Sequence, residues 1–223
     1  MTVYIRELAA ALSAQGAATD VFTRATGDGP RVAELGPNVR VISIDAGPRA
    51  PVAKDRLRQH LGEFVNGVRA FATTQRIGYD LIHSHYWQSG LAGKALAERW
   101  GVPLVHSHHT LGRVKNRWLA PGDAPEPALR LAGEQEVIDA ADVLVASTGE
   151  EWRHLAALFG AAPAHSAVSI GYLPLENELG ASAGGCANAR DGGKAPFPCR
   201  GHQGDPGAVA VSDQRDPPRI HVR

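Results

Sequence analysis

The chain has 223 residues, of which 43% are hydrophobic and 21% are charged, proportions that are ordinary for a soluble globular protein. Lys plus Arg and Asp plus Glu number 23 each, so no excess positive charge predicts binding to nucleic acid or to an anionic membrane. Two cysteines are too few for a disulfide framework. No apolar run approaches the roughly 20 residues that span a bilayer, and the N-terminus is not that of a signal peptide. We therefore expect a cytoplasmic protein without a transmembrane segment.

The first part of the chain predicts a helix, two strands and a second helix. Apolar residues recur at helical spacing from Tyr4 to Leu12. Runs that are rich in β-branched or apolar residues predict strands at 19–23 and 39–44. A stripe of apolar residues at alternating spacings of four and three then runs from Leu57 to Phe71, which is typical of an amphipathic helix.

Strands and helices alternate after this point. Short apolar runs predict strands at 79–83, 102–106 and 142–146, and a capping box at 147–151 predicts the start of the last helix. Continuous apolar strands separated by helices are typical of a parallel sheet that is covered on both faces. The predicted fold class is therefore α/β, a Rossmann-like doubly wound parallel sheet.

Both ends of the pattern depart from such a domain. A doubly wound domain opens with a strand whose turn into the first helix binds phosphate. The pattern here opens on the helix, so we expect residues 1–170 to form a domain that lacks its first strand. Residues 171–223 are dominated by Gly, Pro, Ala, Arg and Asp without any sustained period, which predicts a disordered or aberrant tail.

Polar segments follow three of the predicted strands directly, at 45–54, 83–87 and 106–110. Parallel α/β sheets place their binding sites at the carboxyl ends of the strands. We therefore expect these segments to converge on one crevice.

Four histidines lie at alternate positions in two of these segments: His83, His85, His106 and His108. Alternate spacing places two imidazoles on one face of a strand, as a metal site would require. A zinc or iron hydrolase would also want a carboxylate ligand close by, and neither segment contains one. We favour histidines that line a polar crevice, and structural histidines bonded to the backbone are a further interpretation.

Several cations flank these segments. Lys54 follows a turn and precedes a helix, and Arg130 lies near a helix start, so either is a candidate to face the crevice. We interpret Arg113 and Arg117 as solvated loop residues. The expected folded part contains no nucleophile elbow, P-loop or G-x-G-x-x-G motif, which disfavours a serine hydrolase or a nucleoside-triphosphate site.

Several segments together resemble a known family. They read YDLIHSHYW at 79–87, VPLVHSHHTL at 102–111, VKN at 114–116 and DAPEP at 123–127. The segments are similar to the N-terminal domain of glycosyltransferase family 4. The likeness is greatest to its D-inositol-3-phosphate glycosyltransferase branch, and sucrose-phosphate-synthase-like enzymes are close neighbours.

The resemblance implies a GT-B fold, in which two Rossmann-like domains face one another and the N-terminal one holds the acceptor. It implies that the acceptor phosphate is held by Lys54, Tyr86, Thr110 and Arg130. His109 is the candidate at the catalytic centre, where the resemblance implies contact with the donor sugar rather than the role of a base. The implied reaction retains the anomeric configuration.

The implied function is transfer of a sugar from a nucleotide-sugar, such as a UDP- or GDP-sugar, to a phosphorylated polyol or sugar, with inositol phosphate as one candidate. No cofactor or metal is expected in this chain, and a homodimer is left open. Because the first strand with its Gly-Gly turn and the donor domain are missing from the pattern, we expect the isolated chain to be inactive. The alternatives are a catalytically dead remnant that only binds phosphorylated ligands and a histidine-metal hydrolase.

Overall fold

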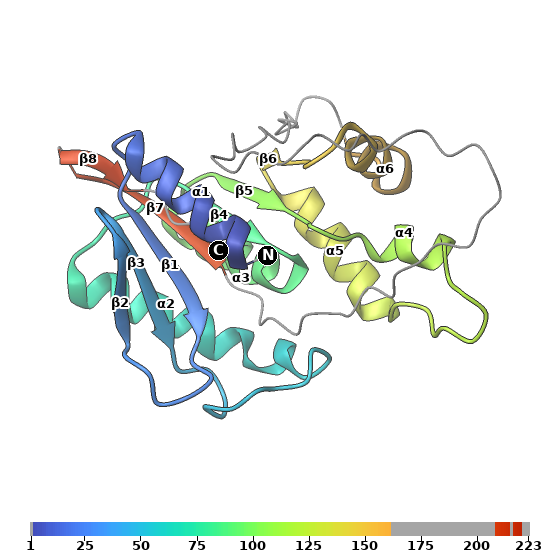
Figure 1. Ribbon diagram of the computed structural model, residues 1–223, viewed down its shortest axis with the longest axis horizontal. Helices are drawn as coiled ribbons and strands as arrows, with labels where there is room; N and C mark the ends of the chain where they lie inside the picture. The colour runs from blue at the N-terminus through green and yellow to red at the C-terminus, as the bar shows by residue number, and fades with distance from the viewer. Residues whose placement is uncertain (1, 162–207, 215, 220–223) are drawn as a thin grey trace, which may run out of the picture.

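The computed structural model describes residues 2–161, 208–214 and 216–219 and is shown in Figure 1. Its helices are α1 (Thr2–Ala14), the short 3-10 helix η1 (Leu57–His60), α2 (Leu61–Gln75), α3 (Trp87–Trp100), α4 (Gly112–Arg117), α5 (Ala128–Ala140) and α6 (Gly149–Phe159). Its strands are β1 (Thr19–Arg24), β2 (Val32–Gly36), β3 (Val39–Ile44), β4 (Ile82–His85), β5 (Leu104–Ser107), β6 (Val143–Leu144), β7 (Ala208–Gln214) and β8 (Asp216–Arg219).

The parallel strands fall into two groups. β1 pairs in parallel with β3, and β4, β5 and β6 form a second parallel group. β7 pairs antiparallel with β1 and also lies beside β4, so it stands between the two groups (Figure 1). This arrangement brings the carboxyl ends of the parallel strands to one edge, where the predicted site residues follow them.

Side chains on both faces of β1 are buried, as a doubly wound sheet requires. Phe22 belongs to the larger core, together with apolar residues of α2, α3, α5 and α6. Its neighbour Val21 points to the other face and packs with Ile5 and Ala9 of α1. Because successive strand residues point to opposite faces, one short strand supports two cores. The predicted α/β class with layers on both faces is confirmed.

The predicted capping box is found at the start of α6. Thr148 is the N-cap, and its hydroxyl accepts a hydrogen bond from the backbone N–H of Glu151 at 3.0 Å. The Glu151 carboxylate accepts in turn from the backbone N–H of Ser147 at 2.7 Å. One free N–H of the first helical turn and the N–H just before the N-cap are thereby satisfied.

Some elements differ from the sequence prediction. The helix expected from Leu57 opens with a 3-10 turn before α2 begins. β2 was not expected because it is an exposed edge strand without a buried apolar face, and α4 is too short to show a helical period. Every helix within the described residues falls short of the length and apolar character that crossing a bilayer requires.

The C-terminal segment also differs from expectation at two places. Residues 208–214 and 216–219 form β7 and β8, although residues 171–223 were expected to lack regular structure. The run Ala-Val-Ala-Val at 208–211 favours a strand, and the edge of β1 offers it backbone hydrogen-bond partners. The other residues of the expected tail lie outside the described residues.

Candidate functional site

The ends of β4 and β5 lie side by side. His85 is in register with Ser107, and the backbone N–H of Tyr86 donates to the carbonyl of Ser107 at 2.9 Å. Just beyond the strand ends, Tyr86 and His109 both have a positive φ, at 74° and 60°. Non-glycine residues rarely adopt this conformation, which costs about 1–3 kcal/mol and is concentrated at functional sites. The sequence carries no signal for this strain.

Three predicted site residues meet at this point. The Nη2 group of Arg130 donates to the hydroxyl of Thr110 at 3.0 Å and to its carbonyl at 3.2 Å. The guanidinium carbon of Arg130 lies 5.2 Å from the centre of the Tyr86 ring, which is a cation–π contact. Thr110 is exposed and Tyr86 is half-buried, so the cluster opens to solvent on this side.

Two carboxylates hold the Arg130 guanidinium in place. Nε donates to Glu134 at 2.8 Å and Nη1 to Glu126 at 2.9 Å. Glu134 is fully buried, and it also accepts the backbone N–H of Gly112 at 2.9 Å. A Cβ atom at Gly112 would come within 2.8 Å of Leu131 and 3.2 Å of the Glu134 carboxylate, so glycine permits this close approach. Arg130 is therefore rigidly oriented.

The ion cluster around Arg130 has no excess charge. Lys115 pairs with Glu126 at 2.9 Å, so two cations face the two carboxylates of Glu126 and Glu134. Burial raises the pKa of Glu134, against the opposing effect of the hydrogen bond from Arg130. Arg130 can direct a hydrogen bond toward a ligand, but net attraction for an anion must come from another group.

The histidines of β4 and β5, and His108 just after β5, are core residues. His83, His85, His106 and His108 are at most 7% exposed. His83 bonds to the hydroxyl of Ser107 at 2.9 Å, and His106 bonds to Ser84 at 2.7 Å. These four side chains therefore do not line a polar crevice, as the sequence favoured. They are buried because this part of the sheet is covered on both faces.

Burial also fixes the charge of these imidazoles. Desolvation lowers the pKa of His83 and of His108 to about 3, so both are neutral at pH 7. Within the part of the chain that the structure describes, no group of three or more His, Cys, Asp or Glu side chains could hold a metal ion. The geometry therefore offers no support for the histidine-metal hydrolase.

His109 lies between the buried histidines and solvent. It is half-buried, its Nε2 lies 2.9 Å from Nδ1 of His85, and the Tyr4 ring packs edge-on against it at 5.3 Å between centroids. Burial lowers the pKa of His109 to about 4. A group with this pKa is neutral at pH 7 and a poor base, which fits contact with a ligand better than proton transfer.

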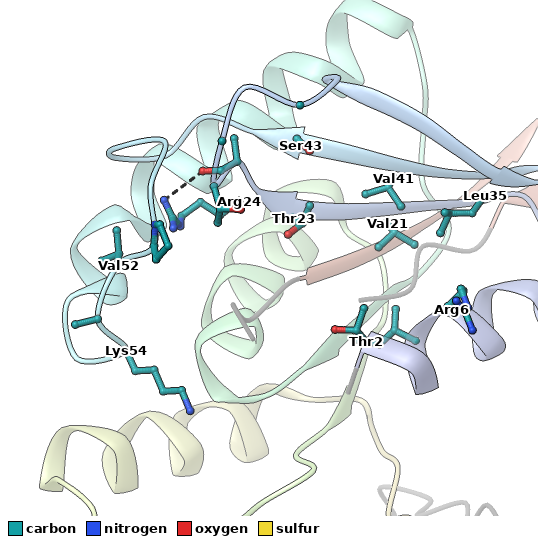
Figure 2. Close-up of a pocket in the computed structure, with 17 residues that line it drawn as sticks. Thr2, Arg6, Val21, Thr23, Arg24, Leu35, Val41, Ser43, Val52 and Lys54 are labelled. Carbon is teal, nitrogen blue, oxygen red and sulfur yellow. Dashed lines mark hydrogen bonds between the residues drawn. The ribbon is translucent and has the colours of Figure 1, made fainter. Parts of the chain in front are cut away.

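Lys54 belongs to a different part of the site. It is exposed, and it lines a cleft of about 1290 Å³ between the start of α1 and the face of β1 and β3. Arg6, Arg24 and Thr23 line the same cleft. Figure 2 shows the Lys54 side chain extending from its loop toward α5, the helix that carries Arg130. Among the described residues no ion pair neutralises Lys54.

The structure thus joins Tyr86, Thr110 and Arg130 by direct contacts. It places Lys54 on a separate loop, whose backbone is bonded to Gln88, two residues after Tyr86. Reasoning from the sequence missed the carboxylates that orient Arg130. The signal was available for Glu134, which lies four residues after Arg130 on α5, the spacing at which side chains meet on a helix. Glu126 precedes this helix.

Comparisons with known proteins agree on one family. The model of the glycosyl transferase 4-like domain matches residues 1–171. The chain is 50% identical over 163 residues to a D-inositol 3-phosphate glycosyltransferase from Xylanimonas cellulosilytica, covering 72% of this chain and 39% of that protein. It is 47% identical over 194 residues to the D-inositol 3-phosphate glycosyltransferase of Streptomyces bingchenggensis, covering 86% of this chain and 43% of that protein.

A solved structure extends the likeness to the fold. Sucrose-phosphate synthase from Thermosynechococcus elongatus superposes with a TM-score of 0.64 and 33% identity, covering 69% of this chain and 38% of that one. The predicted fold class, the Rossmann-like N-terminal half of a GT-B glycosyltransferase, is confirmed. The chain spans about two fifths of the length of the curated relatives that it matches. On the family match, the sequence identity and the shared fold, the chain belongs to the glycosyl transferase 4-like family.

Proposed function

We propose that this chain is the acceptor-binding half of a retaining glycosyltransferase that moves a sugar from a nucleotide-sugar to a phosphorylated polyol, with inositol phosphate as the leading candidate. The observation that carries the proposal is the direct contact of Arg130 with Thr110 and Tyr86 at the ends of neighbouring strands. The names of the relatives support the acceptor class.

In this proposal the four predicted residues bind the phosphate through different interactions. Thr110 and Tyr86 offer hydroxyl groups, and Arg130 offers a donor whose direction is fixed by Glu126 and Glu134. Because the Arg130 ion cluster has no excess charge, Lys54 supplies most of the net attraction for the anion. His109, neutral at pH 7, contacts the donor sugar.

The test is calorimetric titration of the full chain with inositol 3-phosphate and with unphosphorylated inositol. We expect binding of the phosphorylated ligand only. Lys54→Met should weaken it tenfold or more, since a charge-assisted hydrogen bond contributes about 1.5–3 kcal/mol. Lys94→Met is the matched control, because Lys94 pairs with Glu98 of α3 and Glu136 of α5 and does not line the cleft. Equal affinity for the two ligands, or an unchanged Kd in Lys54→Met, would refute the phosphate site.

We propose further that the isolated chain binds the acceptor without transferring sugar to it. Holding donor and acceptor together is worth about 7–11 kcal/mol of the reaction barrier, and the acceptor-binding half by itself does not supply that alignment. Incubation with UDP- and GDP-sugars should give no glycosylated product above a heat-inactivated control. Turnover by the purified chain would contradict this part of the proposal.

The cytoplasm remains the proposed location of the protein, on the basis of the sequence alone.

A further inference from the structure

The loop at 45–54 is held in place by side chains from three other elements. Between β3 and η1 its backbone accepts three hydrogen bonds, from Arg24 to the carbonyls of Pro48 at 2.6 Å and Ala50 at 2.7 Å and from Gln88 to the carbonyl of Lys54 at 2.6 Å. It donates a fourth, from the N–H of Gly47 to the Glu63 carboxylate at 2.8 Å. These donors and acceptors come from β1, α3 and α2. A surface loop that was only a connection would not need such attachment.

Arg24 is the central residue of this attachment. It is the last residue of β1, it is 6% exposed, and it is in register with Ile44, the last residue of β3 before the loop. Taking a guanidinium out of water is costly unless its donors are satisfied. Here two nitrogens of Arg24 donate to loop carbonyls. The buried cation is therefore used to fix backbone, in the wall of the cleft that Lys54 also lines.

Gln88 fixes the other end of the loop. It is 1% exposed in the first turn of α3, two residues after Tyr86, and its amide holds the carbonyl of Lys54 itself. The backbone of Lys54 is thus tied to the helix that begins at the acceptor cluster. In Figure 2 Arg24 and Lys54 lie along the same side of the cleft.

We infer that Arg24 is a positioning residue of the acceptor site, which holds the loop so that the Lys54 side chain extends toward α5. The inference rests on the proposed function in assigning Lys54 to the phosphate. Its physical basis is preorganisation: a loop that is already ordered loses less conformational entropy when the ligand binds. Arg24 does not touch the phosphate in this assignment.

The experiment combines two readouts on the full chain. Hydrogen exchange of the peptide covering 45–56 reports the loop, and calorimetry with inositol 3-phosphate reports the site. In Arg24→Gln we expect at least tenfold faster exchange in this peptide and about tenfold weaker binding. Arg24→Lys, which keeps the charge and can reach one carbonyl, should fall between the parent and Arg24→Gln. This conservative variant also carries the test if Arg24→Gln does not fold.

A double-mutant cycle separates positioning from a general loss of structure. If Arg24 acts through Lys54, adding Arg24→Gln to Lys54→Met should weaken binding little further. Arg49→Gln is the matched control, because Arg49 lies on the same loop and pairs only with exposed Asp45 and Asp28 in the described contacts. It should leave both readouts near those of the parent.

Two results would overturn the inference: unchanged loop exchange in Arg24→Gln, or losses of affinity that add fully in the double variant. Failure of the parent chain to bind inositol 3-phosphate would instead refute the proposed function. Loop exchange would in that case still decide whether Arg24 orders the segment that carries Lys54.

Discussion

The two sides of the candidate site are built in opposite ways. On the side of β4, β5 and α5, Arg130 is 5% exposed and two carboxylates hold its guanidinium. On the side of β1 and β3, Lys54 is exposed on a loop whose backbone is fixed while its side chain stays free of any ion pair among the described residues. Arg130 is therefore part of the core, whereas Lys54 lies on a surface loop that is attached to the core by hydrogen bonds.

This difference indicates that stability and ligand binding can be separated. A change on the Arg130 side removes a partner from a buried charge and should affect folding first. A change at Lys54 removes charge from water and should affect binding alone. The following predictions test this separation, beginning with the largest expected effect on stability.

Acid should destabilise the β4–β5 side most. The pKa values of His83 and His108 lie near 3 and that of His109 near 4 in the folded chain, against about 6.5 when unfolded. The unfolded chain therefore binds protons first. Stability should be constant above pH 6.5 and fall as the pH drops toward 3, by about 2 kcal/mol for each histidine at pH 5.

Urea unfolding between pH 7.5 and 4.5 measures this dependence. His108→Gln should reduce the slope of stability against pH, because it removes one of the titrating groups. If the free energy of unfolding is the same at pH 7 and pH 5, the prediction is wrong. The histidines would then bind protons equally in the folded and the unfolded chain.

Breaking the Arg130 ion pair should have the next largest effect. Glu134→Ala leaves a buried guanidinium short of a partner, and such losses cost about 3–5 kcal/mol. Glu136→Ala, on the same helix but exposed, should cost at most about 1 kcal/mol. Replacing both charges, as Arg130→Met with Glu134→Leu, should recover much of the loss. Thermal unfolding of the four proteins distinguishes these cases, and equal losses in the two single variants would contradict the contrast.

Substitution of Gly47, in the loop that carries Lys54, should be destabilising although Gly47 is not buried. Gly47 has a φ of +68°, and a Cβ there would meet the His60 ring at 2.5 Å. Gly47→Ala should therefore cost about 1–2 kcal/mol and weaken inositol 3-phosphate binding by displacing Lys54. Gly36→Ala, where no atom lies within 4 Å of the added Cβ, should change neither the midpoint nor the affinity.

Substitution of Lys54 itself should have the smallest effect on the free energy of unfolding. Lys54→Met should keep the free energy of unfolding within about 0.5 kcal/mol of the parent, although it is the variant expected to lose phosphate binding. Denaturant midpoints of the Lys54→Met and Lys94→Met proteins check this. A large loss of stability in Lys54→Met would mean that the lysine packs into the fold, and the separation between the two sides would then not hold.

The sequence by itself determined the fold class and the approximate positions of most elements. The reason is that burying one face of a helix or strand makes apolar residues recur with the period of that element. It predicted β3 at 39–44 and placed the start of α6 at a capping box. It also led, through the family resemblance, to Tyr86, Thr110 and Arg130, which the structure joins. The boundary of the domain near residue 170 stays a prediction.

Only the tertiary structure decided what surrounds each of these residues. Alternating histidines are spaced alike whether they line a crevice or fill a core, and the helices packed on both faces of the sheet determine that His83 and His106 are buried. The attachment of the Lys54 loop to Arg24 and Gln88 joins residues 24 to 34 positions apart. No local period encodes such contacts, because they arise from the register of β1 with β3 and from the packing of α3 against α2 and β4.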